Sequence, residues 1–362
     1  MGTVEKTAGA AAVTPAEPRD WDEIARAARP VIGRYCRACA VCDGRACGNQ
    51  IPGPGAKGSG DVARRNYDAW RDVRLNMDTL VGGDAADASC ELLGRRLSMP
   101  LLIGPVGDVN RHYGPSLDTM AYNRLSLAAA RAEGIAAFTG DGIPDELMVQ
   151  SCDAIREVDG WGVPTIKPWS REKVAAKMRV ADACGPLAIA MDVDAAGLPF
   201  LKGQEPPAGP KSPEDLAVIA AMTERPFVVK GVMTVGGALK AARAGASAIV
   251  VSNHGGRVLD GCPATAEVLP EIAAAVRARA PQVTILVDGG IRSGVDVFRA
   301  LALGADGVLV CRPFVVAAYG AGQAGIAFLI RRMRAELQDA MMMCGARSIA
   351  DVTPDMVRVA RR

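Results

Sequence analysis

From residue 99 onward, short apolar runs alternate with longer segments in which apolar positions recur at helical spacing. Within the runs the apolar residues are continuous, which is typical of strands in a parallel sheet covered on both faces. The runs predict eight strands, at 100–104, 134–139, 163–166, 186–191, 226–229, 247–251, 283–287 and 307–310. The Ala- and Arg-rich segments between them predict helices, among them 118–133, 171–183, 213–223 and 294–303. With a last helix at 327–343, the pattern predicts an α/β fold, a closed (β/α)₈ TIM barrel.

The residues before the first predicted strand have a different character. Residues 1–20 are rich in Ala, Thr and Pro and are expected to be a disordered tail. Residues 21–98 form a Cys-rich and helical N-terminal extension, in which Asp20 is expected to cap a helix. A second helix in the extension carries Tyr67 and Trp70. The barrel is expected to occupy 99–346, and 347–362 to be a C-terminal tail.

Composition excludes several classes of partner. The chain has 362 residues, a net charge of +2 and no long basic block, which disfavours nucleic acid and anionic membranes. No apolar run approaches the ~20 residues of a membrane span, and the start lacks the apolar region of a signal peptide. Ten cysteines in such a chain indicate thiols or metal ligands, not a disulfide framework. We expect a soluble, cytoplasmic protein.

Reactive side chains follow six of the eight predicted strands. Active sites of (β/α)₈ barrels lie at the carboxyl ends of the strands, so we expect these side chains to meet there. A barrel that served only as a scaffold would not be expected to carry such groups repeatedly. They are Lys167, Asp192, Lys230, His254 with Arg257, Asp288 with Arg292, and Cys311 with Arg312.

His254 and Arg257 lie just past the strand at 247–251. Imidazole titrates near neutral pH, which suits a general base, and a guanidinium suits a two-point clamp on a carboxylate. Lys230 is compatible with a Schiff-base nucleophile or with an electrostatic partner, and the sequence leaves this open. The other histidine, His112, is expected to be an exposed loop residue.

A phosphate site is predicted at the last two strand ends. Asp288-Gly289-Gly290 ends the seventh strand and Arg312 the eighth, where barrels of this kind usually bind phosphate. Arg292 and Arg312 supply charge for bidentate contacts. The stretch from Gly53 to Gly58 also matches the dinucleotide pattern GxGxxG, but no strand precedes it, and we interpret it as a loop.

At these residues the chain resembles a known family. Ser252-Asn-His-Gly-Gly-Arg257, Val229-Lys-Gly-Val and Val287-Asp-Gly-Gly-Ile-Arg292 closely resemble motifs of the FMN-dependent α-hydroxy-acid oxidases and dehydrogenases. The resemblance is dense over 225–313 and extends more thinly back to residue 99. It implies an FMN-binding (β/α)₈ barrel that is usually a tetramer or octamer.

The resemblance also implies roles for individual residues. His254 would take the substrate proton, Arg257 would bind the substrate carboxylate, and Lys230 would lie beside the flavin ring. The family's aspartate after the fourth strand corresponds to Asp192, which we expect to orient His254. The FMN contacts expected at strand ends, including those to its phosphate, are Gly104, Thr139, Thr165, Lys230, Ser252, Asp288, Gly289, Gly290, Arg292, Cys311 and Arg312.

Three departures from the family pattern concern the substrate. The third strand ends in Thr165-Ile-Lys167 where the family usually has Gln-Leu-Tyr, so Lys167 is expected to contact the substrate. No arginine follows Asp192 where the family has a substrate-binding one. A substrate-facing N-terminal tyrosine of the family has no clear counterpart. Proton removal and flavin binding therefore look intact, whereas the substrate pocket looks rebuilt.

Four cysteines in the extension have no counterpart in the familiar members: Cys36, Cys39, Cys42 and Cys47. Close cysteine spacing suggests metal ligation. The first three match ferredoxin spacing, but the fourth comes one residue late and is followed by Gly48 instead of proline. An iron–sulfur cluster, a zinc ion and a set of free or redox-active thiols all stay open.

These features predict an FMN-dependent (S)-2-hydroxy-acid oxidase or dehydrogenase, with the segment 195–213 as a candidate lid. Its partners would be a small 2-hydroxy acid and, if the cysteines bind a cluster, an electron-acceptor protein. One alternative is an FMN-dependent isomerase or an oxidase of a modified peptide on the same barrel. Another is a flavin- and metal-binding module for electron transfer or redox sensing.

Overall fold

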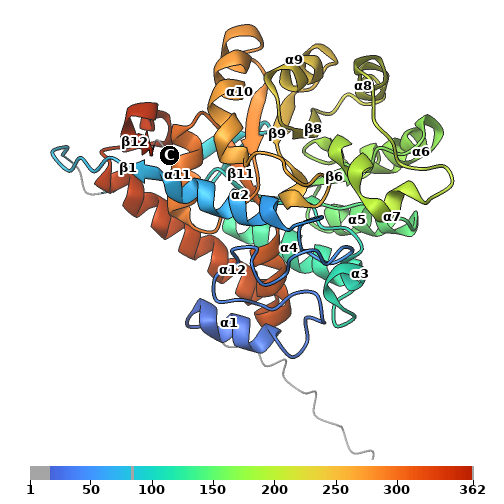
Figure 1. The fold of residues 1–362 in the computed structure, drawn as a ribbon, viewed down its shortest axis with the longest axis horizontal. Helices are drawn as coiled ribbons and strands as arrows, with labels where there is room; N and C mark the ends of the chain where they lie inside the picture. Colours follow the sequence, from blue (N-terminus) through green and yellow to red (C-terminus); the bar gives the residue numbers. More distant parts are fainter. Residues whose placement is uncertain (1–16, 83–84, 361–362) are drawn as a thin grey trace, which may run out of the picture.

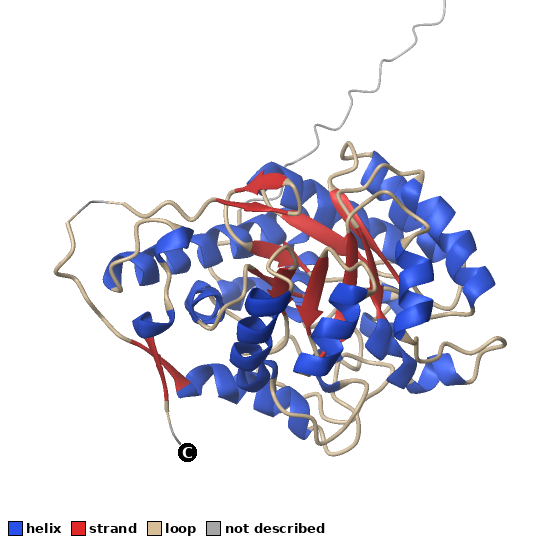
Figure 2. Cartoon of the chain, turned by 90° about the horizontal axis from the view of Figure 1, so that it is seen from above, coloured by secondary structure: helices blue, strands red, loops and turns tan. Residues whose placement is uncertain are grey.

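The computed structural model describes residues 17–82 and 85–360, so most of the predicted N-terminal tail lies outside the described residues. Its centre is a closed barrel of eight parallel strands in chain order, in which the last strand pairs with the first. Helices surround the strands (Figures 1 and 2). The strands are β4 (Leu101–Ile103), β5 (Ala136–Thr139), β6 (Gly162–Ile166), β7 (Ile189–Asp192), β8 (Phe227–Val232), β9 (Ala248–Val251), β10 (Thr284–Val287) and β11 (Gly307–Val310). The predicted (β/α)₈ barrel is confirmed.

Four helices of the shell begin and end within three residues of their predicted bounds, which are 118–133, 171–183, 213–223 and 294–303. Several have the capping side chain that their sequence predicts; the Asp118 carboxylate, for example, accepts a hydrogen bond from the Ala121 amide at 2.7 Å. The helices are α4 (Thr119–Glu133), α5 (Glu146–Arg156), α6 (Arg171–Asp182), α8 (Pro213–Ala220), α9 (Val235–Arg243), α10 (Thr265–Arg279), α11 (Gly294–Ala302) and α12 (Arg312–Met343). Short elements in the loops are α3 (Val109–Tyr113), η1 (Val193–Gly197), α7 (Pro199–Lys202) and η2 (His254–Gly256).

Alternate residues of each barrel strand face opposite sides, because successive side chains of a strand point in opposite directions. In β9, Ala248 and Val250 belong to the core inside the barrel, whereas Ile249 and Val251 pack with the helices outside. Both sets are fully buried. This two-sided burial explains why the strands read as continuous apolar runs.

The N-terminal extension covers one end and one side of the barrel. α1 (Trp21–Ala28), capped by Asp20, packs on α12, and α2 (Asp61–Asp72) carries the buried Trp70. The hairpin β2 (Cys90–Leu92) and β3 (Arg95–Leu97) contributes Leu92 and Leu97 to the core inside the barrel. The hairpin therefore closes the barrel at the amino ends of its strands.

The last residues of the chain are bound to the extension. After η3 (Ile349–Asp351) and η4 (Pro354–Met356), β12 (Val357–Val359) pairs antiparallel with β1 (Val73–Leu75), beside the C-terminus in Figures 1 and 2. The segment expected to be a tail, 347–362, therefore contains a paired strand. The partner strand β1 lies almost 300 residues earlier in the chain, so the local sequence pattern does not predict β12.

The final helix, α12, is longer than predicted. It begins at Arg312, directly after β11, and non-helical dihedral angles at Ala321 and Gly322 divide it. By length and composition alone α12 could cross a membrane, but 61% of its most apolar window is buried inside the fold. It packs against α1, α4 and α11 as part of the shell.

Candidate active site

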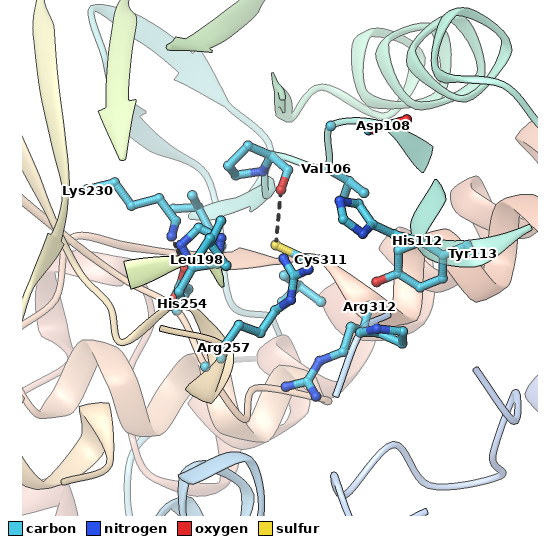
Figure 3. Close-up of a pocket in the computed structure, with 18 of the residues that line it drawn as sticks. Val106, Asp108, His112, Tyr113, Leu198, Lys230, His254, Arg257, Cys311 and Arg312 are labelled. Carbon is cyan, nitrogen blue, oxygen red and sulfur yellow. Dashed lines mark hydrogen bonds and ion pairs between the residues drawn. The ribbon is translucent and has the colours of Figure 1, made fainter. Parts of the chain in front are cut away.

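A pocket lies at the carboxyl ends of the barrel strands and encloses about 940 Å³, open solvent at its mouth included. This is the size and place expected of a small-molecule site in such a barrel. In Figure 3, Lys230 and His254 lie on one side, His112 and Tyr113 on the other, and Arg257, Cys311 and Arg312 between them. Of the residues predicted from sequence, those that line it are Lys167, Lys230, His254, Arg257, Asp288, Gly289, Gly290, Arg292, Cys311 and Arg312.

The polar floor of the pocket continues the inward-facing register of the strands. In β8, Val228 faces the barrel interior, so Lys230 two residues later also points inward. The same step of two leads from Val250 to Ser252 and from Leu286 to Asp288. Every second residue of a strand points inward, so the inward-facing residues after the apolar ones form a polar layer at the carboxyl ends of the strands.

His254 sits in a left-handed turn that packs against α2. Its φ is +56°, and Gly255 and Gly256 also have positive φ. A Cβ at Gly256 would lie 2.9 Å from the Cβ of Ala56 and 3.0 Å from the Ala63 amide, so only glycine allows this close approach. The turn directs the imidazole into the pocket.

The carboxylate that contacts His254 is Asp194, not Asp192 as expected. Asp194 Oδ1 accepts from His254 Nδ1 at 3.0 Å, which leaves Nε2 as the proton acceptor of the ring. Asp192 instead binds Lys167, with 2.6 Å between Nζ and Oδ2. Asp192 is still close, because ligand atoms of Asp192, Asp194 and His254 all lie within 4.8 Å of one another. The physical reason is that Lys167, which was predicted to contact the substrate, forms an ion pair with Asp192 instead.

The environment favours the neutral form of His254. Burial lowers its pKa well below the usual value, and the charges of Lys230 and Lys167 lower it further. Burial raises the pKa of Asp194, against the opposing effect of the same two lysines. A neutral imidazole with a buried carboxylate behind it can accept a proton and then be stabilised as a cation.

Lys230 is held as a charged group on the pocket floor. Its ammonium donates to Ser252 Oγ at 3.0 Å and lies 3.3 Å from Asp288 Oδ2. Burial alone would lower its pKa, but the carboxylates of Asp288 and Asp194 outweigh burial and raise the pKa. A lysine that stays protonated cannot act as a Schiff-base nucleophile, so the electrostatic interpretation of Lys230 is the one that fits.

On the opposite side of the pocket, one backbone carbonyl of the N-terminal extension, that of Pro52, contacts two side chains. Pro52 O accepts from Arg257 Nη2 at 3.0 Å and also contacts His112 Nδ1. Arg257 Nε is buried without a partner, which leaves it available to a ligand. His112 has 7% of its surface exposed and lines the pocket, so the expectation of an exposed loop histidine is wrong.

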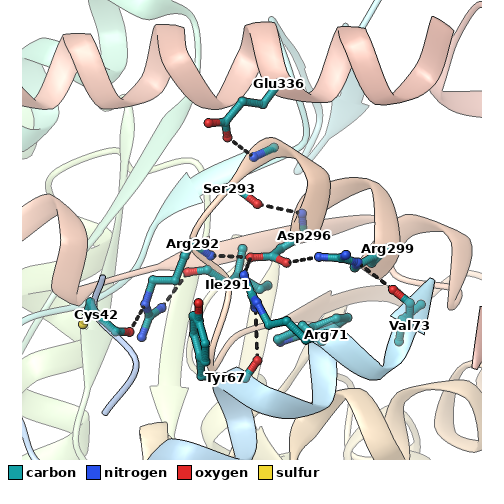
Figure 4. A network of polar contacts seen from close by, with 12 residues as sticks. Cys42, Tyr67, Arg71, Val73, Ile291, Arg292, Ser293, Asp296, Arg299 and Glu336 are labelled. Atoms are coloured by element: carbon teal, nitrogen blue, oxygen red, sulfur yellow. Dashed lines mark hydrogen bonds and ion pairs between the residues drawn. The ribbon is translucent and has the colours of Figure 1, made fainter. Parts of the chain in front are cut away.

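The end of the pocket near α11 has the chemistry of an anion site. Gly289 and Gly290 have positive φ and line the pocket, as do Arg292 and Arg312. Figure 4 shows how Arg292 is held: Nε donates to Cys42 O at 2.6 Å, and its backbone amide donates to Asp296 Oδ2 at 2.9 Å. Arg312 Nη1 is buried without a partner.

Four residues predicted to bind the cofactor lie around the pocket but not on its surface: Gly104, Thr139, Thr165 and Ser252. The hydroxyls of Thr139 and Thr165 are buried without hydrogen-bond partners. A Cβ at Gly104 would overlap the Cys311 sulfur, so the absence of a side chain there keeps the two strand ends close. Two residues of the candidate lid, Leu198 and Phe200, line the pocket.

Several site residues were missed from sequence. His112 and Tyr113 form the end of α3, directly after the first barrel strand, and this position was the signal that could have identified them. Asp194 carried a weaker signal, as a second acid two residues after Asp192. Tyr113 also places a tyrosine in the pocket, where the sequence showed no counterpart of the family's substrate-facing one.

Comparison with known proteins gives consistent matches over most of the chain. A model of the family described as FMN-dependent dehydrogenase matches residues 54–205 and 203–359. The peroxisomal (S)-2-hydroxyacid oxidase GLO3 of Arabidopsis thaliana is 32% identical over 328 residues, covering 81% of this chain and 87% of the relative. An L-lactate dehydrogenase of Allorhizobium ampelinum is 31% identical over 355 residues, covering 81% and 89%.

Solved structures agree with these matches. A crystal structure of a mandelate oxidase variant with 2-hydroxy-phenylacetamide superposes with a TM-score of 0.76 at 30% identity. The match covers 94% of this chain and 99% of that chain, so the N-terminal extension is largely included.

Proposed function

The chain belongs to the family of FMN-dependent dehydrogenases, and on this premise we propose that it oxidises a 2-hydroxy acid to a 2-oxo acid with His254 as the base. The relatives that it resembles over more than four fifths of its length are named for 2-hydroxy acids or lactate. The observation that carries the assignment is the imidazole of His254, hydrogen-bonded through Nδ1 to the carboxylate of Asp194, in one pocket with Arg257.

The residues present fit FMN. Gly289, Gly290 and Arg312 offer backbone amides and an unpartnered guanidinium nitrogen to a phosphate. The unpartnered hydroxyls of Thr139 and Thr165 are suited to hydrogen bonds with a polar ring edge or a ribityl chain. When bound there, FMN supplies the acceptor for the hydride that leaves the substrate carbon.

Arg257 holds the carboxylate of the substrate, and His254 removes the proton of the substrate hydroxyl. Arg257 presents its free Nε to the carboxylate, and its Nη2 bond to Pro52 O fixes the plane of the fork. Nε2 of His254 takes the hydroxyl proton as the substrate carbon loses its hydride. Asp194 holds the Nδ1 proton and stabilises the resulting imidazolium.

Lys230 and Lys167 differ in what they contribute. Lys230 keeps a positive charge in the pocket floor, where negative charge develops on the cofactor side as the acid is oxidised. Lys167 lines the pocket, but its ammonium is engaged by Asp192. The proposed substrate contact of Lys167 therefore requires its ammonium to exchange the ion pair with Asp192 for the substrate.

The test is reduction of bound FMN under anaerobic conditions by a panel of 2-hydroxy acids. His254→Asn should keep FMN yet slow reduction by at least ~10², because the proton acceptor is lost. Arg257→Lys should chiefly raise the acid concentration needed for half-maximal rate, because an ammonium cannot reproduce the planar fork. Arg243→Lys, exposed at the end of α9, is the matched control and should behave as wild type.

Reduction at near-normal rates in both pocket variants would refute the assigned roles. FMN that no hydroxy acid reduces would favour the isomerase or redox-module alternatives.

We also propose that the protein is a homo-oligomer and that a second protein accepts its electrons. Assembly into a tetramer or octamer follows from the family resemblance and is measured by light scattering at several protein concentrations. A protein electron acceptor would make O₂ a poor oxidant of the reduced enzyme. Rapid peroxide formation in air would contradict it.

A further inference from the structure

The four cysteines of the extension lie together in a loop between α1 and α2. All ten cysteines of the chain are free thiols in the structure, and these four are half-buried. The thiol of Cys36 is within electrostatic reach of Cys39, Cys42 and Cys47. The twelve residues from Cys36 to Cys47 thus carry four soft ligand atoms, and none of these thiols is among the groups proposed to bind FMN.

Close packing fixes this loop against α2 and the pocket wall. Gly44 has φ +82°, and a Cβ there would lie 2.9 Å from the backbone of Ala63 in α2. A Cβ at Gly55 would overlap the Cys47 carbonyl oxygen. Further along the loop, the Pro52 carbonyl accepts a hydrogen bond from Arg257, and Pro54 lines the pocket. The cysteine loop is therefore a built part of the fold, continuous with the active site.

The spacing of the sulfurs argues against zinc. Among the described residues, one group of three His, Cys, Asp or Glu side chains has all its ligand atoms within 4.8 Å, and it contains no cysteine. Four thiolates around zinc, at Zn–S distances of about 2.3 Å, would have their sulfurs less than about 4 Å apart. An iron–sulfur cluster holds its thiolates around a larger body than a single ion.

The surroundings supply positive charge for an anionic cluster. Arg292 Nε donates to the Cys42 carbonyl at 2.6 Å, and Arg312 lies within electrostatic range of Cys42 and Cys47. Both arginines also line the pocket proposed to bind the flavin. The two arginines lie between the cysteine loop and the phosphate end of the pocket, and each of these sites would hold negative charge. One nitrogen of each guanidinium is buried without a partner: Arg292 Nη2 and Arg312 Nη1.

We propose that Cys36, Cys39, Cys42 and Cys47 bind an iron–sulfur cluster next to the phosphate end of the flavin pocket, with Arg292 and Arg312 as shared counter-charges. The Cys-x₂-Cys-x₂-Cys spacing is the one ferredoxins use, and Gly44, with φ +82°, turns the chain between the third and fourth cysteines. The proposal does not depend on which substrate the flavin oxidises.

The experiment is metal analysis of the full-length holoprotein, purified without oxygen and reconstituted with ferrous iron and sulfide. Iron and acid-labile sulfide should be bound in equal amounts, on the order of two to four of each per chain. Dithionite reduction should give a low-temperature EPR signal. Zinc and FMN are measured in the same samples, so that flavin occupancy reports folding.

Cysteine variants identify the ligands. Cys39→Ser and Cys42→Ser should each lose most of the iron and sulfide, whereas Cys90→Ser, a half-buried cysteine of the β2–β3 hairpin, should keep wild-type content. Wild-type protein that binds zinc without sulfide, or neither metal, would overturn the proposal even if a variant failed to fold. Equal iron loss in Cys90→Ser would also overturn it.

Discussion

At the scale of single residues, two carboxylates two positions apart have different partners. Asp192 pairs with Lys167, and Asp194 accepts from His254 Nδ1. Asp194→Asn should slow FMN reduction by about 10², because the amide can donate to Nδ1, stabilise the wrong tautomer and remove the counter-charge of the imidazolium. Stopped-flow absorbance measures the rate, and flavin content shows that the pocket is intact.

The same measurement on two further variants isolates the effect of Asp194. Asp194→Glu keeps the negative charge and should be slowed less than the Asn variant. Asp87→Asn replaces an exposed acid far from the pocket and should leave the rate unchanged. A wild-type rate in Asp194→Asn would show that the Nδ1 contact does not set the tautomer.

At the scale of elements, one buried carboxylate joins the extension to the barrel. Asp296 in α11 is fully buried and lies 2.9 Å from Arg71 of α2 and 2.7 Å from Arg299, in the network of Figure 4. Asp296→Ala should lower the free energy of unfolding by about 3 kcal/mol, because both arginines lose their carboxylate. Urea denaturation measures it. Asp61→Ala, which removes an exposed pair with Arg64, should change stability by less than about 1 kcal/mol.

At the scale of the whole molecule, FMN should stabilise the fold because its proposed contacts come from strand ends and loops that are far apart in sequence. Free FMN at 100 times its dissociation constant should add about 2.7 kcal/mol to the free energy of unfolding of the flavin-free protein. Riboflavin, which lacks the phosphate, should add less at the same concentration. Arg312→Ala should reduce this difference between the two flavins, and equal stabilisation by both flavins in wild type would contradict the phosphate site.

Much of the barrel and part of the site could be predicted because their causes are local. A strand buried on both faces must be apolar along its whole length, so each of the eight strands is visible as a short run. The helix cap at Asp20 depends on four neighbouring residues. Lys230, His254 and Arg257 follow their strands directly, and barrel geometry requires such residues to meet.

Only the tertiary structure decided which groups contact each other. Asp194 became the partner of His254 because Lys167, from another strand, took Asp192. His112 is buried because Pro52, sixty residues earlier, supplies a carbonyl to its ring. β12 is a strand because β1 offers an edge to it. In each case the stabilising partner is distant in sequence, so its effect is absent from the local pattern and arises when the chain is folded.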